Sequence, residues 1–119
     1  MKRMLVQSLL LAALFVAVTL FGGQFQQEVF DIGDLSGVDV KATEAAFMQS
    51  QSNEDLVRLV KALCWRYRMA EDETVIQPFM TYGQIMLDRA KAEEIDLEFV
   101  DDPDHMLQVL DVLRELGVK

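Results

Sequence analysis

An uncharged apolar run from Met4 to Gly23, directly behind Lys2 and Arg3, limits what this chain can become more than any other feature. Leu, Ala and Val dominate the run, and all three favour a helix where the backbone has no water to bond. At 1.5 Å rise per residue, a helix of these 20 residues is about 30 Å long, the thickness of a bilayer's hydrocarbon core. The sequence therefore predicts a transmembrane anchor over residues 1–23.

Two other interpretations of this run stay open: a cleaved signal peptide, and a buried helix of a soluble domain. Cleavage requires small residues at positions −3 and −1 of the cut. A cut after Gly22 puts the bulky Leu20 at −3, and a cut one residue later puts Phe21 there. Because this cleavage signal is poor, we expect an uncleaved single-span anchor.

The charges that flank the run predict its orientation. Lys2 and Arg3 precede it, whereas four acids come before Lys41, the next cation along the chain. Positive charge stays on the cytoplasmic side of a membrane, so we expect a cytoplasmic amino terminus and a carboxyl domain outside the cytoplasm, a compartment that in a Gram-negative bacterium is the periplasm. The part beyond the span has nine cations against 20 acids, a net charge of −11, while the part before it carries +2.

The chain beyond the span divides into a linker and a helical domain. Residues 24–39 contain Gly33 and Gly37 and lack a sustained apolar period, which indicates a linker, with a short strand over residues 29–32 as an alternative. Residues 40–119 repeat apolar side chains at the three- and four-residue spacing of amphipathic helices. The predicted fold is therefore all-α: a single transmembrane helix followed by a small helical hairpin or bundle of three to four helices.

Local signals place these helices along the sequence. We expect them at about residues 40–49, 53–70, 74–94 and 103–116. Ser52 starts the second helix in a pattern that resembles a capping box, and Pro78 suits the first turn of the third. Asp101 or Asp102 caps the fourth, and Gly117 ends it. The apolar side expected for the first, weaker helix consists of Ala42, Ala45, Ala46 and Phe47.

The counts of cysteine and histidine argue against several kinds of site. One Cys cannot form an intramolecular disulfide framework or a Cys-based zinc knuckle, and one His disfavours a multi-His metal site. Cys64 is expected to be a buried small hydrophobe, with a reactive thiol as the alternative. His105 at the start of the fourth helix has an alternative role as a base or pH sensor. We predict no catalytic residue, cofactor or metal ion, and therefore no enzyme.

The first surface predicted to bind a partner lies on the second helix. At 100° per residue, one face of this helix gathers four basic and aromatic side chains: Arg58, Lys61, Trp65 and Arg68. Trp and Arg are the residue types most enriched in interface hot spots. This face suits a protein partner or a lipid headgroup, and the alternative is an ordinary solvated basic face.

The second surface is the acidic stretch from Glu93 to Asp104, with the candidate residues Glu98, Asp101 and Asp102. It suits a basic partner, and its alternative is a solvated turn. Apolar residues alternate with acids over residues 95–99, which favours a short extended segment. The spacing of an EF-hand calcium loop is absent from this stretch.

Charge and topology together indicate the class of function. A chain with a net charge of −9 is not expected to bind nucleic acid. We expect a non-enzymatic, single-pass protein of the cytoplasmic membrane that serves as an accessory or scaffolding subunit of a larger membrane complex. Its partners would be other subunits of that complex, and residues 4–23 would contact the lipid. The alternative is an exported small acidic binding protein, of the immunity or inhibitor type, that neutralises a basic partner.

Overall fold

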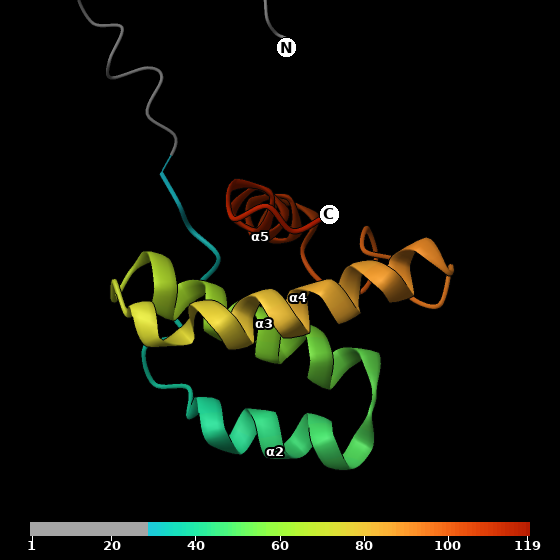
Figure 1. Ribbon diagram of the computed structural model, residues 1–119, viewed down its shortest axis with the longest axis horizontal. Coiled ribbons are helices and arrows are strands. Elements are labelled where there is room, and N and C mark those ends of the chain that lie inside the picture. The colour runs from blue at the N-terminus through green and yellow to red at the C-terminus, as the bar shows by residue number, and fades with distance from the viewer. Residues whose placement is uncertain (1–28) are drawn as a thin grey trace, which may run out of the picture. The chain divides into compact units, whose positions relative to one another are not determined.

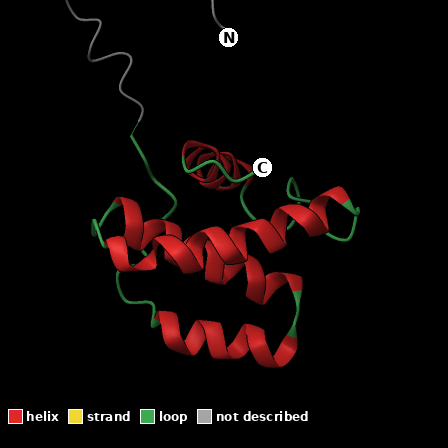
Figure 2. Cartoon of the chain, in the orientation of Figure 1, coloured by secondary structure: helices red, strands yellow, loops and turns green. Residues whose placement is uncertain are grey.

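A computed structural model of the chain describes residues 29–119, in which helices are joined by loops and no strand occurs (Figures 1 and 2). The α-helices are α2 (Val40–Ser50), α3 (Asn53–Arg68), α4 (Ile76–Lys91) and α5 (Pro103–Glu115), and the 3-10 turn η1 (Glu73–Val75) leads into α4. The prediction of an all-α domain of three to four helices is confirmed for residues 29–119. The predicted membrane span at residues 4–23 lies outside the described part of the chain. Within the described part, no helix has the length and apolar character needed to cross a bilayer.

Helix α3 is the centre of the compact unit that residues 31–119 form. It contacts α2, α4 and α5, and side chains of α2 also contact α4. In Figure 1 these three helices run across the view and α5 is seen end-on above them. Helix α3 supplies much of the core with its buried residues Leu56, Val57, Leu59, Val60, Ala62, Leu63 and Cys64.

Helices α2, α3 and α5 each start after a residue whose side chain caps them, and the cap of α3 differs from the expected pattern. Ser52 Oγ accepts a hydrogen bond from the backbone N–H of Asp55 at 3.1 Å, which is one half of a capping box. The other half is missing, because the Ser52 N–H donates to Ser50 Oγ at 3.1 Å. The carboxylate of Asp55 instead accepts from the Ser50 hydroxyl and from Arg58. An Asp side chain is one methylene shorter than Glu, so the reciprocal bond of a capping box is out of its reach.

Helix α5 begins and ends as the sequence predicts. Asp102 Oδ1 accepts from the N–H of Asp104 at 2.9 Å, and Pro103 takes the first helical position. At the other end Gly117 has a φ of +89°, and the next N–H bonds back to the carbonyl of Leu113 at 3.0 Å. Helix α4 is shorter than expected, because Glu93 adopts a φ of +63° just after it.

The expected apolar side of α2 is wrong in three of its four residues. Ala42, Ala45 and Ala46 are exposed, and only Phe47 is buried. The rings of Phe47 and Tyr82 form a T-shaped pair with 5.9 Å between their centroids. The Arg89 guanidinium lies over the Phe47 ring, 5.4 Å from its centroid. Three alanines offer little apolar area, so the single large ring decides which way α2 faces.

The chain before α2 is part of the compact unit from Asp31 onward. The side chain of Ile32 is 1% exposed. The side-chain amide of Gln108 in α5 bonds both backbone groups of the preceding residue, Asp31. Gln108 Oε1 accepts from the Asp31 N–H at 2.7 Å, and Gln108 Nε2 donates to the Asp31 carbonyl at 3.0 Å. The backbone of Asp31 is therefore bonded to α5, and the side chain of Ile32 is part of the core.

Helices α4 and α5 cross at a glycine. A Cβ built on Gly83 would lie 2.4 Å from Cδ2 of Leu113, well inside van der Waals contact. Gly83 is buried within α4 and Leu113 is fully buried in α5. The missing side chain of Gly83 is thus what lets the two helices approach this closely.

Candidate functional site

The two surfaces predicted to bind partners meet in the fold at Lys61. Its ammonium donates to Asp101 Oδ2 at 3.1 Å, and it also lies 3.0 Å from Nδ1 of His105. The Lys61 side chain is only 12% exposed, while that of Asp101 is 30% exposed. A residue of the predicted basic face is therefore paired inside the protein with a residue of the predicted acidic surface.

Geometry around His105 sets the tautomer of its ring. An ammonium has only donors, so Nδ1 of His105 accepts the hydrogen bond from Lys61 and the ring proton is on Nε2. Nε2 lies 3.9 Å from a carboxylate oxygen of Asp102, which also caps α5. The imidazole thereby links α3 to the start of α5, and both of its nitrogens face groups of the protein.

Burial and hydrogen bonding shift the pKa of Asp101 in opposite directions. Partial burial alone raises this pKa, whereas the hydrogen bonds from the Asp102 N–H and from Lys61 lower it. The net result is a pKa below the ordinary 3.8. The Asp101–Lys61 contact is thus an ion pair at neutral pH.

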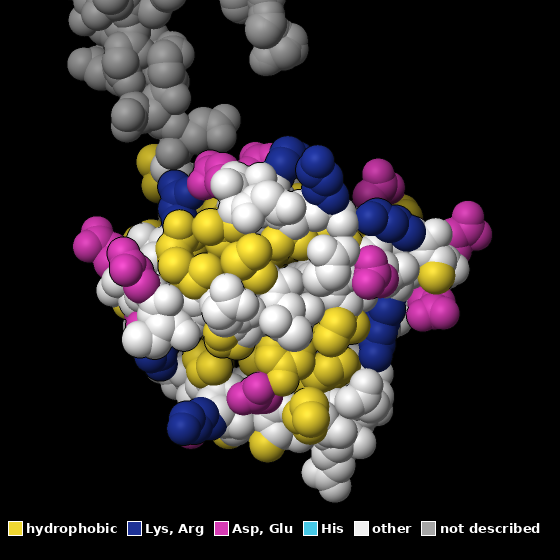
Figure 3. Space-filling view, viewed as in Figure 1, with side chains coloured by type: hydrophobic (Ala, Val, Ile, Leu, Met, Phe, Trp, Pro, Cys, Tyr) yellow, Lys and Arg dark blue, Asp and Glu magenta, His cyan; other side chains and the backbone are white. Residues whose placement is uncertain are grey.

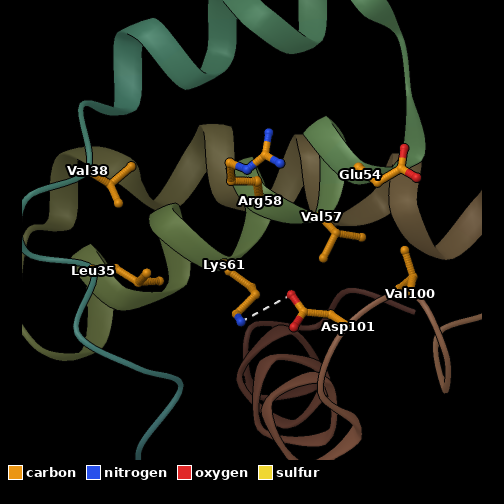
Figure 4. Close-up of a pocket in the computed structure, with 8 residues that line it drawn as sticks. All are labelled: Leu35, Val38, Glu54, Val57, Arg58, Lys61, Val100 and Asp101. Carbon is orange, nitrogen blue, oxygen red and sulfur yellow. Dashed lines mark hydrogen bonds and ion pairs between the residues drawn. The ribbon is translucent and has the colours of Figure 1, made fainter.

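A shallow cleft of about 370 Å³ lies beside this ion pair (Figure 4). In the close-up, Lys61 and Asp101 point toward one another, and the guanidinium of Arg58 points away from Lys61. The walls come from the segment before α2, from α3 and from the turn before α5, and they include Leu35, Val38, Val57 and Val100. The cleft brings together three of the seven predicted partner-binding residues, namely Arg58, Lys61 and Asp101.

The remaining residues of the predicted basic face are spread along α3, and two of its cations bind acids of the same chain. Arg58 forms an ion pair with Asp55 one turn earlier. Arg68 Nη1 lies 3.2 Å from Glu115 Oε1 of α5, and Trp65 is half-buried. Their charges are partly compensated, so this face offers less free positive charge than the sequence suggests.

The acidic stretch forms a turn and not the short extended segment expected from its alternating pattern. Asp96 causes this, because its carboxylate accepts from the Glu98 N–H at 3.0 Å. Its carbonyl accepts from the N–H groups of Phe99 at 3.1 Å and Val100 at 2.9 Å. The carboxylates of Glu98 and Asp102 are exposed on this turn, while Asp101 faces Lys61.

The turn and α5 also form an apolar groove of about 270 Å³ that the sequence analysis misses. Phe99 is 81% exposed and Leu107 is 61% exposed, although both are large and apolar. The groove is lined by Leu97, Phe99, Pro103, Met106, Leu107 and Leu110, with Glu98 at its edge. We call this surface the acidic-rimmed groove. The apolar residues among the acids of residues 95–99 were its one signal in the sequence.

Most cations of the compact unit bond to another group of the protein, whereas many of its acids do not. Residues 31–119 hold nine Lys and Arg against 19 Asp and Glu, a net charge of −10. Within the described part, four cations pair with carboxylates and three donate to backbone carbonyls: Arg58, Lys61, Arg68 and Arg114, then Arg66, Arg89 and Lys91. Six exposed glutamates have no side-chain partner among residues 29–119: Glu54, Glu71, Glu73, Glu93, Glu94 and Glu98.

Figure 3 shows one face of the molecule. Hydrophobic side chains gather toward the middle of the view, and charged side chains of both signs stand mainly around its edge. Cys64 is hidden in the core, where burial raises the pKa of its thiol to about 12. The prediction that Cys64 is a buried small hydrophobe is confirmed.

Residues 29–119 contain no group of three or more His, Cys, Asp or Glu placed to hold a metal ion.

Comparisons of the chain with protein family models, with curated proteins and with solved structures find no significant match.

Proposed function

We propose that this chain is a non-enzymatic, single-pass membrane protein whose helical domain docks onto other subunits of a larger membrane complex. In this proposal the protein acts as an accessory or scaffolding subunit. The domain is in the extracytoplasmic space, and the anchor at residues 4–23 keeps it beside its partners. Lys2 and Arg3 hold the amino terminus in the cytoplasm.

The Lys61–Asp101 ion pair is the observation that supports this proposal most. It turns a cation of the predicted basic face inward, while the exposed glutamates of the same unit stay without a partner. The domain thus presents mainly negative charge to its surroundings. A surface of one sign speeds and orients association with a complementary protein, which is what a docking subunit requires.

The reactive side chains of the domain support a non-enzymatic role. The Cys64 thiol is enclosed in the core with a pKa near 12, so it is protonated at neutral pH. Nδ1 of His105 accepts a hydrogen bond from Lys61, so it is not free to take a proton from a substrate. Both groups contribute to the packing of α3 and α5.

Sodium carbonate extraction tests the anchor. We expect the full chain to stay in the membrane pellet, because about 20 apolar residues in lipid are not released by high pH. A reporter fused after Lys119 tests the orientation, and it should be active only outside the cytoplasm. Release of the protein into the supernatant contradicts the anchor, and activity in the cytoplasm contradicts the orientation.

The charge of the compact unit also favours a second function, an exported acidic protein that neutralises a basic partner. A net charge of −10 on residues 31–119 suits fast electrostatic capture of such a partner. The two functions differ in the fate of the amino terminus. A mature chain that lacks residues 1–23 and binds one basic protein in a salt-sensitive way favours the second function.

A further inference from the structure

The acidic-rimmed groove is built from two segments that approach in space. Helix α5 contributes a stripe of apolar residues at helical spacing, from Pro103 through Leu107 to Leu110. The turn contributes Leu97 and Phe99 as the opposite wall. The eight residues from Pro103 to Leu110 extend about 10 Å along the helix axis, which matches roughly two turns of another helix laid along the groove.

The groove leaves apolar surface in water that a small soluble unit normally buries. Phe99 and Leu107 are 81% and 61% exposed, and they are two of the five large hydrophobic side chains with high exposure among residues 29–119. Exposed large apolar side chains that share one concave surface are typical of interaction sites. Removing them from water favours the binding of a partner of matching shape.

The charges around the groove select the partner. Glu98 is the acid among the described residues that line it, and it has no side-chain partner in residues 29–119. Asp96, Asp102 and Asp104 are its neighbours in the sequence, and Asp96 and Asp102 also accept hydrogen bonds from nearby backbone N–H groups. Among residues 29–119, no Lys or Arg lines the groove. A partner segment that carries Lys or Arg beside its apolar residues would find apolar contacts and opposite charges together.

We propose that this groove binds a cationic amphipathic helix of a partner protein. The helix places apolar side chains at positions i, i+3 or i+4, and i+7 between Phe99 and Leu107, and its Lys or Arg residues face Glu98 and the neighbouring aspartates. This inference rests on the proposed function and names the chemistry of the partner. It accounts for the exposed apolar pair and for the acidic rim with a single occupant.

Charge argues against the two other occupants that an apolar groove can have. A second copy of this chain would bring an identical acidic rim against Glu98, and like charges oppose that contact. Anionic lipid headgroups are repelled by the same carboxylates. A cationic protein segment meets neither obstacle.

Photocrosslinking in the cells that make the protein tests the groove. Benzoylphenylalanine replaces Leu107 in the full chain, and the matched control carries it in place of Met48, which is 60% exposed on α2. We expect an adduct from position 107 whose crosslinked segment, identified by mass spectrometry, is net positive and repeats apolar residues every third or fourth position. A lipid adduct, a dimer of this chain, a neutral or acidic segment, or no adduct overturns the proposal.

A charge reversal at the rim provides the second arm. Glu98→Lys should reduce the yield of the position-107 adduct at least about fivefold, the effect of losing one contact of more than 1 kcal/mol. Glu73→Lys is the matched control, because it makes the same change at an exposed glutamate of η1 and should leave the yield unchanged. Equal yields from the two variants overturn the role of the rim. Unchanged helical circular dichroism shows that both variants fold.

Carbonate washing and partner recovery from the same cells distinguish an error in the groove proposal from an error in the proposed function. If the protein stays in the carbonate-washed membrane and recovers partner subunits that Phe99→Ser and Leu107→Ser do not weaken, the groove is wrong and the function stands. If the protein is neither in the membrane nor associated with other proteins, both are wrong. Loss of the partners in the two serine variants, with retention by Met48→Ser, supports both.

Discussion

The ammonium of Lys61 lies 3.1 Å from a carboxylate oxygen of Asp101, across a separation of 40 residues in the chain. This contact joins the middle of α3 to the turn before α5. It also decides how the surface is charged, because it withdraws a cation from the face of α3 and leaves the other acids of the turn to the solvent. The partner-binding proposals for this domain depend on that arrangement.

Lys61→Met should lower the free energy of unfolding by about 1–3 kcal/mol, because it leaves the half-buried Asp101 carboxylate without its cation. Urea denaturation of the full chain in mild detergent, followed by circular dichroism, measures this change. Arg114→Met is the matched control. Its ion pair with Asp111 has both side chains more than 60% exposed, so we expect a change within about 0.5 kcal/mol. Equal effects of the two substitutions would contradict a structural role for Lys61.

Asp101→Asn should lower the stability of the folded chain by an amount that depends on pH. The folded-state pKa of Asp101 lies below the ordinary 3.8, so its stabilising effect is present above that pH and is lost as the pH falls through the folded-state value. The wild-type chain should therefore exceed the variant in stability at neutral pH, and the difference should shrink below about pH 4. Thermal denaturation at several pH values measures it. A difference that stays constant down to pH 2 would refute the ion pair as its cause.

Gly83→Ala should destabilise the protein by about 1–2 kcal/mol, the net of overpacking against Leu113 and a better helix propensity. The new methyl group would meet Cδ2 of a fully buried leucine at 2.4 Å. Gly37→Ala is the matched control, because nothing lies within 4 Å of a Cβ there and its φ is not positive. Urea midpoints of both variants test the crossing of α4 and α5. A neutral Gly83→Ala would show that this crossing is loose.

Cys64 should resist alkylation in the native protein. Its thiol is fully buried and has a pKa near 12, so at pH 8 almost no thiolate is present for reaction. Mass spectrometry after iodoacetamide treatment should show labelling only when denaturant is added. Fast labelling of the native chain at pH 8 would mean that the core around α3 opens readily.

Features that depend on neighbours in sequence were the ones the sequence could predict. Ser52, the Asp102–Pro103 pair and Gly117 act within one or two turns, so the starts of α3 and α5 and the end of α5 follow from them. The docking of Ile32 and the clamp by Gln108 join residues 77 positions apart, and no local pattern indicates them.

The candidate site was predicted residue by residue but not as an arrangement. Lys61 and Asp101 were each expected to meet a partner protein, and they meet one another instead, because α5 folds back against α3. The sequence showed the apolar Leu97 and Phe99 among the acids, but it could not show that Leu107 lies beside them. Only the turn organised by Asp96 brings these side chains into one groove.

Mild-detergent purification of the full chain with a tag after Lys119, with intact mass and co-purified proteins measured on one sample, tests the central proposal most directly. We predict a mass that includes residues 1–23 and stoichiometric recovery of integral membrane proteins. A chain that begins after the apolar run and is recovered from the soluble fraction would contradict the proposed membrane subunit.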